Sequence, residues 1–160
     1  MSKRSLLGLA AAALLLSAAG YGITQAQDKD AAFIGYRQHL MQSQGFHIGS
    51  IVAILKGEWP YKQDGPAHAK ALAADSLLIP DAFKTQTADV KTDAKPDIWK
   101  DWSKFEGKAK DLQRETAKLS DIANSSDMSG VPAQVKKVGE ACKSCHDDFR
   151  KPKEQSYKNG

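Results

Sequence analysis

The sequence has 160 residues, which is enough for one domain with a single hydrophobic core. Its formal net charge is +4 with no polybasic run, which excludes the strongly basic surface typical of a nucleic-acid-binding protein. Aromatic residues make up only 8%, whereas Ala, Lys and Asp are frequent, so the composition favours helices over strands.

The N-terminus has the three parts of a secretory signal peptide. A lysine and an arginine at positions 3 and 4 form a short basic region, residues 6–16 are apolar, and residues 24–26 form a small-residue cleavage site. The apolar run is short for a membrane span, although an uncleaved N-terminal anchor is the alternative. We therefore expect a signal peptide over residues 1–26 and one domain over residues 27–160.

Two helices are predicted in the first half of that domain. The first runs from Asp30 to Leu55 and is ended by Gly57 and Pro60. The second begins at Asp64, a capping residue followed by Gly-Pro, and is closed by Pro80. Residues at steps of three and four mark the inward stripe of the first helix: Phe33, Arg37, Leu40, Met41, Gln44, Ile48, Ile51, Val52 and Leu55.

A polar connection from Phe83 to Lys95 leads to two further helices. Pro96 opens the third helix, residues 125–130 form a loop, and Pro132 lies in the first turn of the fourth helix. The inner faces of these helices carry Ile98, Trp99, Trp102, Phe105, Ala109, Leu112, Thr116 and Leu119, and then Val135, Val138, Cys142, Cys145 and Phe149. Four antiparallel helices with short links and one longer crossover predict an all-α four-helix bundle, where a cofactor lies between facing helices.

The most informative pattern is the run Cys142-Lys143-Ser144-Cys145-His146, which is the C-x-x-C-H arrangement of a c-type haem attachment site. Cysteines three residues apart lie on one side of a helical turn, so both sulfurs can reach the vinyl groups of one porphyrin edge. The following histidine can bind the iron as the proximal ligand. The sequence therefore predicts one covalent haem c. Because haem is attached to such proteins outside the cytoplasm, we expect the domain to work in a bacterial periplasm.

Other uses of two cysteines find less support. A thioredoxin-like dithiol needs a βαβ context, and a disulfide closing so short a loop would stabilise little. A structural zinc site usually needs two spaced pairs of ligands, and the chain has no second cysteine pair. His39, His47 and His68 lie far upstream without zinc-finger spacing, and we expect His39 and His47 to be surface residues.

The sequence resembles the class II cytochromes c, which comprise cytochrome c prime and its low-spin relatives. Five segments carry the resemblance, in order over nearly all of the expected domain: Tyr36–Met41, Lys56–Tyr61, Ile79–Phe83, Lys95–Trp99 and Cys142–Arg150. The resemblance implies a four-helix bundle with haem attached to the C-terminal helix.

The same resemblance implies roles for individual residues. Cys142 and Cys145 would form the thioethers, and His146 would bind the iron. Arg37 would pair with a haem propionate, whereas base rates alone favour a solvated surface arginine. Arg150 would pack near the proximal histidine, one turn after it. Phe83 would lie near the haem, with ordinary core packing as the alternative.

Met41 decides between two functions. As a distal ligand it would give six-coordinate, low-spin iron suited to single-electron transfer with periplasmic or membrane-bound redox partner proteins. As a packing residue it would leave a vacant distal position for nitric oxide or carbon monoxide. The Gly57–Tyr61 stretch resembles low-spin members more closely, so the electron carrier is the main expectation and the gas-binding protein is the alternative.

The remaining expectations concern catalysis and assembly. The sequence contains no G-x-S-x-G, H-E-x-x-H or Gly-rich phosphate loop, so we do not expect an enzyme. Members of the resembled family often dimerise through their first two helices. A homodimer would use apolar residues left outside the core, for which Ile34, Ile54 and Leu77 are candidates.

Overall fold

The computed structural model describes residues 4–88, 91–125 and 127–159, with side chains from Lys29 to Lys158. Helices account for its regular structure, and the described residues form no strand beyond one isolated antiparallel bridge between Ala94 and Arg150. The α-helices are α1 (Arg4–Leu55), α2 (Gly65–Leu77), α3 (Ile79–Phe83), α4 (Asp97–Lys100), α5 (Trp102–Ala123) and α6 (Val131–Phe149). Short 3₁₀ helices cover Lys62–Asp64, Lys153–Gln155 and Tyr157–Asn159.

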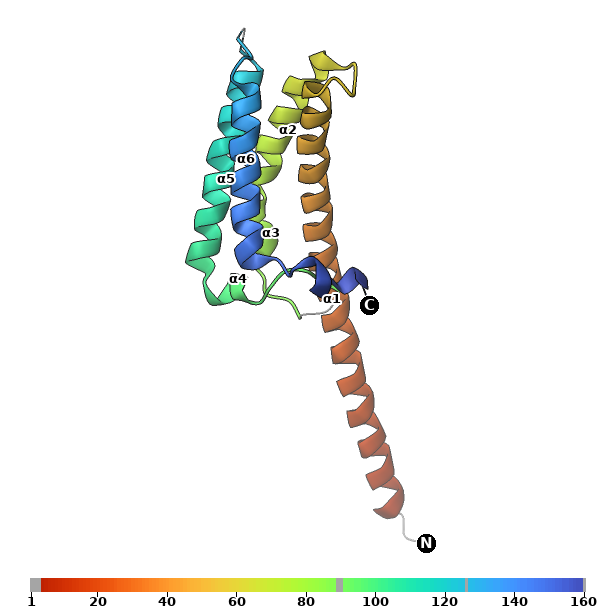
Figure 1. Cartoon of the computed structure of the whole chain (residues 1–160). Coiled ribbons are helices and arrows are strands. Elements are labelled where there is room, and N and C mark those ends of the chain that lie inside the picture. Colours follow the sequence, from red (N-terminus) through yellow and green to blue (C-terminus); the bar gives the residue numbers. More distant parts are fainter. Residues whose placement is uncertain (1–3, 89–90, 126, 160) are drawn as a thin grey trace.

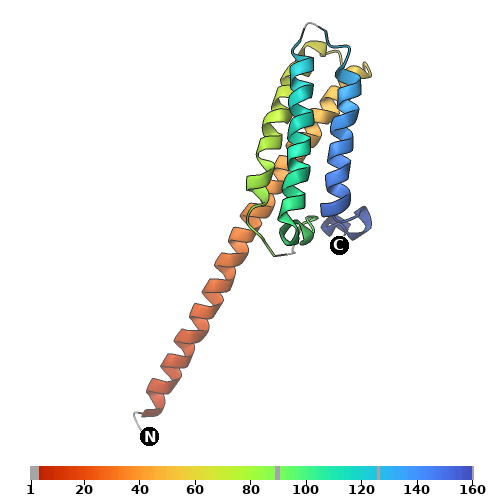
Figure 2. The ribbon, with the colours of Figure 1, turned by 90° about the vertical axis from the view of Figure 1, so that its left-hand side faces the viewer.

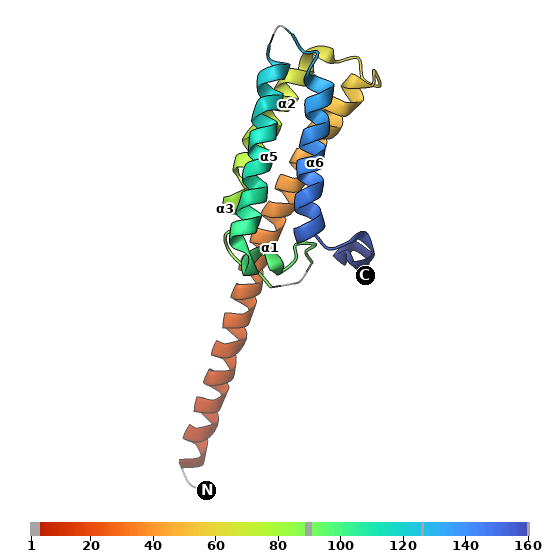
Figure 3. The same cartoon turned by 60° about the vertical axis from the view of Figure 1, so that its left-hand side comes forward.

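The predicted four-helix bundle is confirmed. The C-terminal half of α1 packs on α2, α2 packs on α5, and α5 packs on α6, while α1 and α6 contact each other only sparsely (Figures 1 and 3). The short helices α3 and α4 lie at one end of the bundle, where α6 also ends (Figure 1). Helices α1 and α6 are therefore the most loosely packed neighbours among the four long helices.

Helix α1 begins much earlier than predicted. The predicted start at Asp30 is wrong, because the helix already runs from Arg4 and its N-terminal half extends away from the bundle (Figure 2). Residues 5–28 contain no proline and are rich in Ala and Leu, which have the highest helix propensities. In the part of the chain that the structure describes, no helix is long and apolar enough to cross a membrane. The signal peptide remains a prediction.

The predicted end of α1 at Leu55 is confirmed. Gly57 adopts φ 75°, a conformation that favours glycine. The N–H of Gly57 donates to the carbonyl of Ile54 at 3.0 Å, and the N–H of Glu58 donates to that of Ala53 at 2.9 Å. These bonds form a Schellman motif, which satisfies the last carbonyls of the helix.

The second and third predicted helices are each divided in two by a short break in the helical backbone. Pro80 does not close the second helix: α2 ends at Leu77, and Pro80 lies in the first turn of α3, where its missing N–H does no harm. The third predicted helix is divided at Asp101, whose backbone leaves helical geometry at φ −128°, ψ 65°. The Asp101 carboxylate accepts a bond from the N–H of Lys104 at 3.1 Å and so caps α5.

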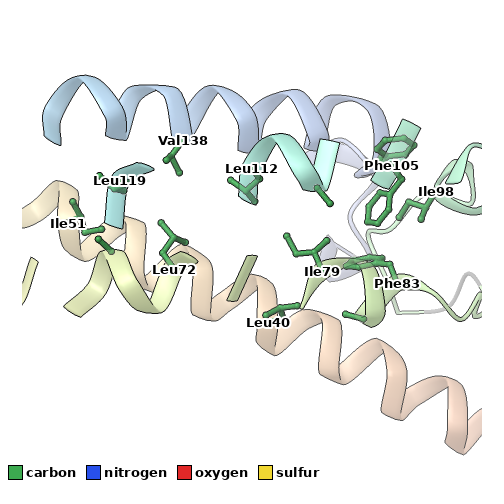
Figure 4. Close-up of a cluster of buried hydrophobic side chains, with 14 of the residues drawn as sticks. Leu40, Ile51, Leu72, Ile79, Phe83, Ile98, Phe105, Leu112, Leu119 and Val138 are labelled. Atoms are coloured by element: carbon green, nitrogen blue, oxygen red, sulfur yellow. The ribbon is translucent and has the colours of Figure 1, made fainter. Parts of the chain in front are cut away.

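The core lies between the four long helices, and Figure 4 shows its largest side chains converging from α1, α2, α5 and α6. The predicted stripe of α5 is buried as expected, namely Phe105, Ala109, Leu112, Thr116 and Leu119. On α1 the prediction fails at both ends of the stripe, because Phe33 and Leu55 are exposed. Phe33 precedes the closely packed part of the bundle, and Leu55 is the last residue of the helix.

The connection between α3 and α4 positions the end of the bundle. Its Ala88 N–H donates to the Asp30 carboxylate at 2.9 Å, and Gln38 Nε2 donates to the Lys91 carbonyl at 2.9 Å, so the connection crosses α1. Further on, the Lys95 N–H donates to the Phe149 carbonyl at 2.9 Å. A segment predicted only as polar thus ties α1 to the C-terminal end of α6.

Candidate haem site

Helix α6 presents the two cysteines to the interior. Cys142 and Cys145 are half-buried, carry free thiols and pack against the hydrophobic core. Burial raises the pKa of Cys142, and it raises the pKa of Cys145 to about 11, with the neighbouring Cys142 adding to the shift. Reactive dithiols need a lowered pKa, so this environment does not favour a thioredoxin-like pair.

A zinc centre also lacks ligands. Among the residues that the structure describes, no three His, Cys, Asp or Glu side chains come together as a metal site. A structural zinc ion needs four such ligands. The two cysteines, with the sparse packing of α1 against α6, instead fit a planar group inserted between these helices and attached at one edge.

His146 follows Cys145 in the last turn of α6. The residue is exposed, yet its ring is shielded enough that burial lowers the pKa of the imidazole, and the Arg150 charge lowers it further. A neutral imidazole is the form that binds a metal. The residue borders an open cavity of about 710 Å³ between the end of α6 and the residues that follow it. His146 therefore has both the protonation state and the space that an iron ligand needs.

Met41 lies across the bundle on α1. Its side chain is half-buried and packs against the same core cluster as Cys142 and Cys145. Three residues later on the same stripe, the Nε2 of Gln44 is buried without a hydrogen-bond partner. A buried amide is rarely left unpaired, so this face of α1 is suited to a further group with polar atoms.

Arg37 is buried at 3% exposure, so the solvated alternative is wrong. Its Nε donates to the Ala82 carbonyl at 2.8 Å, its Nη1 donates to Thr87 Oγ1 at 2.9 Å, and its Nη2 donates to the Thr85 carbonyl. Burial lowers the pKa of the guanidinium, partly offset by Asp30. These bonds use three of the five N–H groups of a guanidinium, so two remain for a carboxylate such as a haem propionate.

Phe83 belongs to an aromatic cluster at the same end of the bundle. Its ring centroid lies 5.2 Å from that of Phe105, which in turn contacts Trp102 and Phe149 at 5.4 Å each. The Trp99 indole donates to the Phe83 carbonyl at 2.7 Å. Phe83 is thus ordinary core in this structure, next to the end of α6, and a haem contact remains a prediction.

Arg150 ends α6 in an extended conformation, φ −110°, ψ 138°. Its guanidinium is mostly exposed and pairs with Asp93 at 3.7 Å, and its charge acts on His146 one turn earlier. Its predicted role beside an iron-binding histidine remains a prediction. The sequence did not predict its partner Asp93, which lies 57 residues away in the chain.

The other histidines are only partly as expected. His39 is exposed, and its Nδ1 lies 2.8 Å from the Gly35 carbonyl of its own helix. His47 is half-buried, contrary to the prediction, because its Nδ1 lies 3.0 Å from the Nδ1 of His68 on α2. Sequence reasoning considered each histidine by itself and had no signal for a pair between helices.

A lysine pair beside the motif was also missed. Lys108 of α5 donates to the Ser144 hydroxyl, inside the C-x-x-C-H run, and lies 3.5 Å from the Asp148 carboxylate. Lys104 pairs with the same carboxylate at 3.2 Å. These contacts fix the register between α5 and the part of α6 that carries the motif.

Two of the three apolar dimer candidates are not available. Ile34 and Ile54 are buried at 5% and 8% exposure, whereas Leu77 is exposed at 63%. Helix α1 thus directs both isoleucines inward. The homodimer itself stays a prediction.

A family model described as cytochrome C′ matches residues 32–150. Cytochrome c′ of Rhodospirillum rubrum is 32% identical over 149 residues, covering 92% of this chain and 98% of the relative. Cytochrome c-556 of Agrobacterium tumefaciens strain II Chrys is 28% identical over 115 residues, covering 71% and 93%.

Solved structures are also similar to this chain. A ferrous variant of Alcaligenes xylosoxidans cytochrome c prime with bound nitric oxide has a TM-score of 0.70 and 32% identity, covering 78% of this chain and 97% of the other. A carbon monoxide-bound variant of that protein has a TM-score of 0.69 at 32% identity, covering 77% and 97%. Both similarities cover more than three quarters of this chain.

Proposed function

The chain belongs to the cytochrome c′ family, and we propose that it binds nitric oxide or carbon monoxide through its haem. It carries a covalent c-type haem, whose iron supplies an axial position for a diatomic gas. The proposal rests on the similarity to cytochrome c prime of Alcaligenes xylosoxidans, which is matched over 97% of its chain. Solved structures of its variants contain nitric oxide in one case and carbon monoxide in another.

The expected closeness to low-spin electron carriers has no support. The matching family model and the R. rubrum relative are both named for cytochrome c′, and the c-556 relative is less similar. The gas-binding alternative is therefore the better reading. Electron exchange with redox partner proteins becomes the competing outcome of the test below.

The site residues would divide the work of holding the haem. Cys142 and Cys145, buried toward the core, would form the thioethers, and His146 would bind the iron as a neutral imidazole. Three N–H groups of Arg37 donate to the chain, and Arg37 would bind a haem propionate through the remaining two. These four residues come from the two helices that pack most loosely.

Met41 would cover the distal side without ligating the iron. Its thioether side chain is unbranched and adaptable, so it can exclude water and still make way for a small gas. The neighbouring Leu40 is buried in the core at 6% exposure, which keeps this part of α1 in place. Met41 thereby controls how easily a gas enters.

The proposal also covers where the protein acts and whether it catalyses a reaction. The protein would be exported by the signal peptide of residues 1–26 and act in the periplasm, where haem attachment takes place. Binding a gas reversibly needs no catalytic group, in keeping with the expectation that the protein is not an enzyme.

The proposal is tested on the holoprotein by absorption spectroscopy with and without carbon monoxide. We expect high-spin iron in both oxidation states, and carbon monoxide uptake by the ferrous protein. Haem should stay on the protein in acid–acetone, as a covalent attachment requires. A low-spin spectrum with a sulfur-to-iron charge-transfer band and no carbon monoxide uptake would instead establish the electron carrier.

A further inference from the structure

The residues after Arg150 lie beyond the segment that matches the family model, which ends at that residue. They nevertheless pack against the bundle. After α6 the chain turns away from the helix axis and forms the short helices Lys153–Gln155 and Tyr157–Asn159 beside the C-terminal end of α6 (Figure 3). The described part of this segment, residues 151–159, is called the C-terminal cap below.

The cap begins as a paired extended segment. Arg150 forms an antiparallel bridge with Ala94, and the N–H of Lys151 donates to the Asp93 carbonyl at 2.7 Å. With the bond from the Lys95 N–H to the Phe149 carbonyl, these contacts hold the exit from α6 against the α3–α4 connection. The direction of the cap is therefore fixed at its first residue.

The carboxylate of Asp93 then holds the far end of the cap. Its Oδ1 accepts the N–H of Tyr157 at 3.1 Å, its Oδ2 accepts the hydroxyl of Ser156 at 3.1 Å, and Arg150 lies 3.7 Å away. The Asp93 side chain is only 14% exposed. A carboxylate shielded to this degree needs such partners, so its bonds to the cap and the position of the cap depend on each other.

The cap and His146 face the same cavity of about 710 Å³. Its walls include His146 of α6, Arg150 directly after that helix, Asp93 and Lys95 from the connection, and Ser156 and Lys158 from the cap. Without the cap, this cavity would lose the part of its wall that Ser156 and Lys158 form, and the His146 side of α6 would be more open to solvent.

We propose that the C-terminal cap, held by Asp93, restricts access of water and small molecules to the His146 side of the haem, with Asp93 as the positioning residue. The inference rests on the proposed haem site and deepens it. With the His146 side restricted, gas would enter on the Met41 side, and competing ligands would reach the His146 side slowly.

The test compares Asp93→Ala with Asp97→Ala in the holoprotein. Asp97 is an exposed aspartate four residues further on, whose carboxylate accepts a hydrogen bond from Lys100. Hydrogen exchange of the Tyr157 amide reports whether the cap stays in place. Exchange of the ring N–H of His146, followed by NMR through its iron-shifted resonance, reports water access.

In Asp93→Ala both exchange rates should rise about tenfold or more, the effect of losing one hydrogen bond to a charged group, while Asp97→Ala stays at the wild-type rates. Ser156→Ala, which leaves Asp93 in place, should give a smaller rise in the same direction. This milder variant keeps the test decisive should Asp93→Ala fold poorly.

The outcomes separate the cap from the proposed function. Unchanged Tyr157 exchange in both cap variants would show that Asp93 does not hold the cap. Faster Tyr157 exchange with unchanged His146 ring exchange would show that the cap does not restrict access. Either result overturns the inference. Carbon monoxide binding, measured separately, should be the same in all variants, and its absence would overturn the proposed function alone.

Discussion

The guanidinium of Arg37 stacks on the ring of Phe83, 5.1 Å from the ring centroid, and joins α1 to α3 inside the bundle. It also lies 5.2 Å from the Trp99 ring centroid, so the cation contacts two aromatic rings. The most buried charge of the site is thus organised by the chain itself, before any cofactor carboxylate is considered.

This arrangement predicts that Arg37→Leu is strongly destabilising. The change leaves the Ala82 and Thr85 carbonyls and the Thr87 hydroxyl without their donor, so the free energy of unfolding should fall by about 2–4 kcal/mol. Urea denaturation gives the value. Arg114→Leu, at an exposed arginine of α5, should change it by less than about 0.5 kcal/mol. Equal effects of the two changes would contradict the buried role of Arg37.

Met41→Ala should open the distal side. If Met41 covers the iron without ligating it, its removal should raise carbon monoxide affinity roughly tenfold, about 1.4 kcal/mol, and leave the spin state unchanged. Met128→Ala is the matched control, because Met128 is exposed at the other end of the bundle. A change from low to high spin in Met41→Ala would show that Met41 is a ligand after all.

The core can be tested with two leucines of α2. Leu72 is 1% exposed and lies in the main cluster, so Leu72→Ala should lower the free energy of unfolding by about 2–5 kcal/mol. Leu77, at 63% exposure on the same helix, should lose less than about 1 kcal/mol when changed to Ala. Thermal or urea unfolding of the holoprotein decides, and a large loss for Leu77→Ala would point to an interface at that position.

The raised pKa of Cys145 predicts slow alkylation of the folded apoprotein. With a pKa of about 11, only about one thiol in a thousand is ionised at pH 8, so iodoacetamide should react roughly a hundredfold faster after unfolding in urea. Because the folded pKa lies above the unfolded value, the neutral thiol stabilises the fold below about pH 9. That contribution is lost as the pH rises toward 11. Equal alkylation rates in the folded and unfolded states would show that burial does not protect Cys145.

The sequence by itself determined the chemistry and the class of fold. Haem attachment is encoded in adjacent residues, Cys142 to His146, and helices are encoded in local periodicity, so both can be read without knowing any distant contact. The ends of α1 at Leu55 and of the loop at Gly130 follow from glycine and proline, whose backbone limits are also local.

Only the tertiary structure decided which polar residues meet. Three sets of polar contacts join residues that lie 21 to 64 positions apart in the chain. They are the bonds of buried Arg37, the His47–His68 pair and the bonds of Asp93 to the C-terminal cap. Such contacts depend on how the helices and connections pack, and side-chain type alone does not specify them. For the same reason the sequence could name Met41 as the residue of the distal side, while its burial against the core became visible only in the folded bundle.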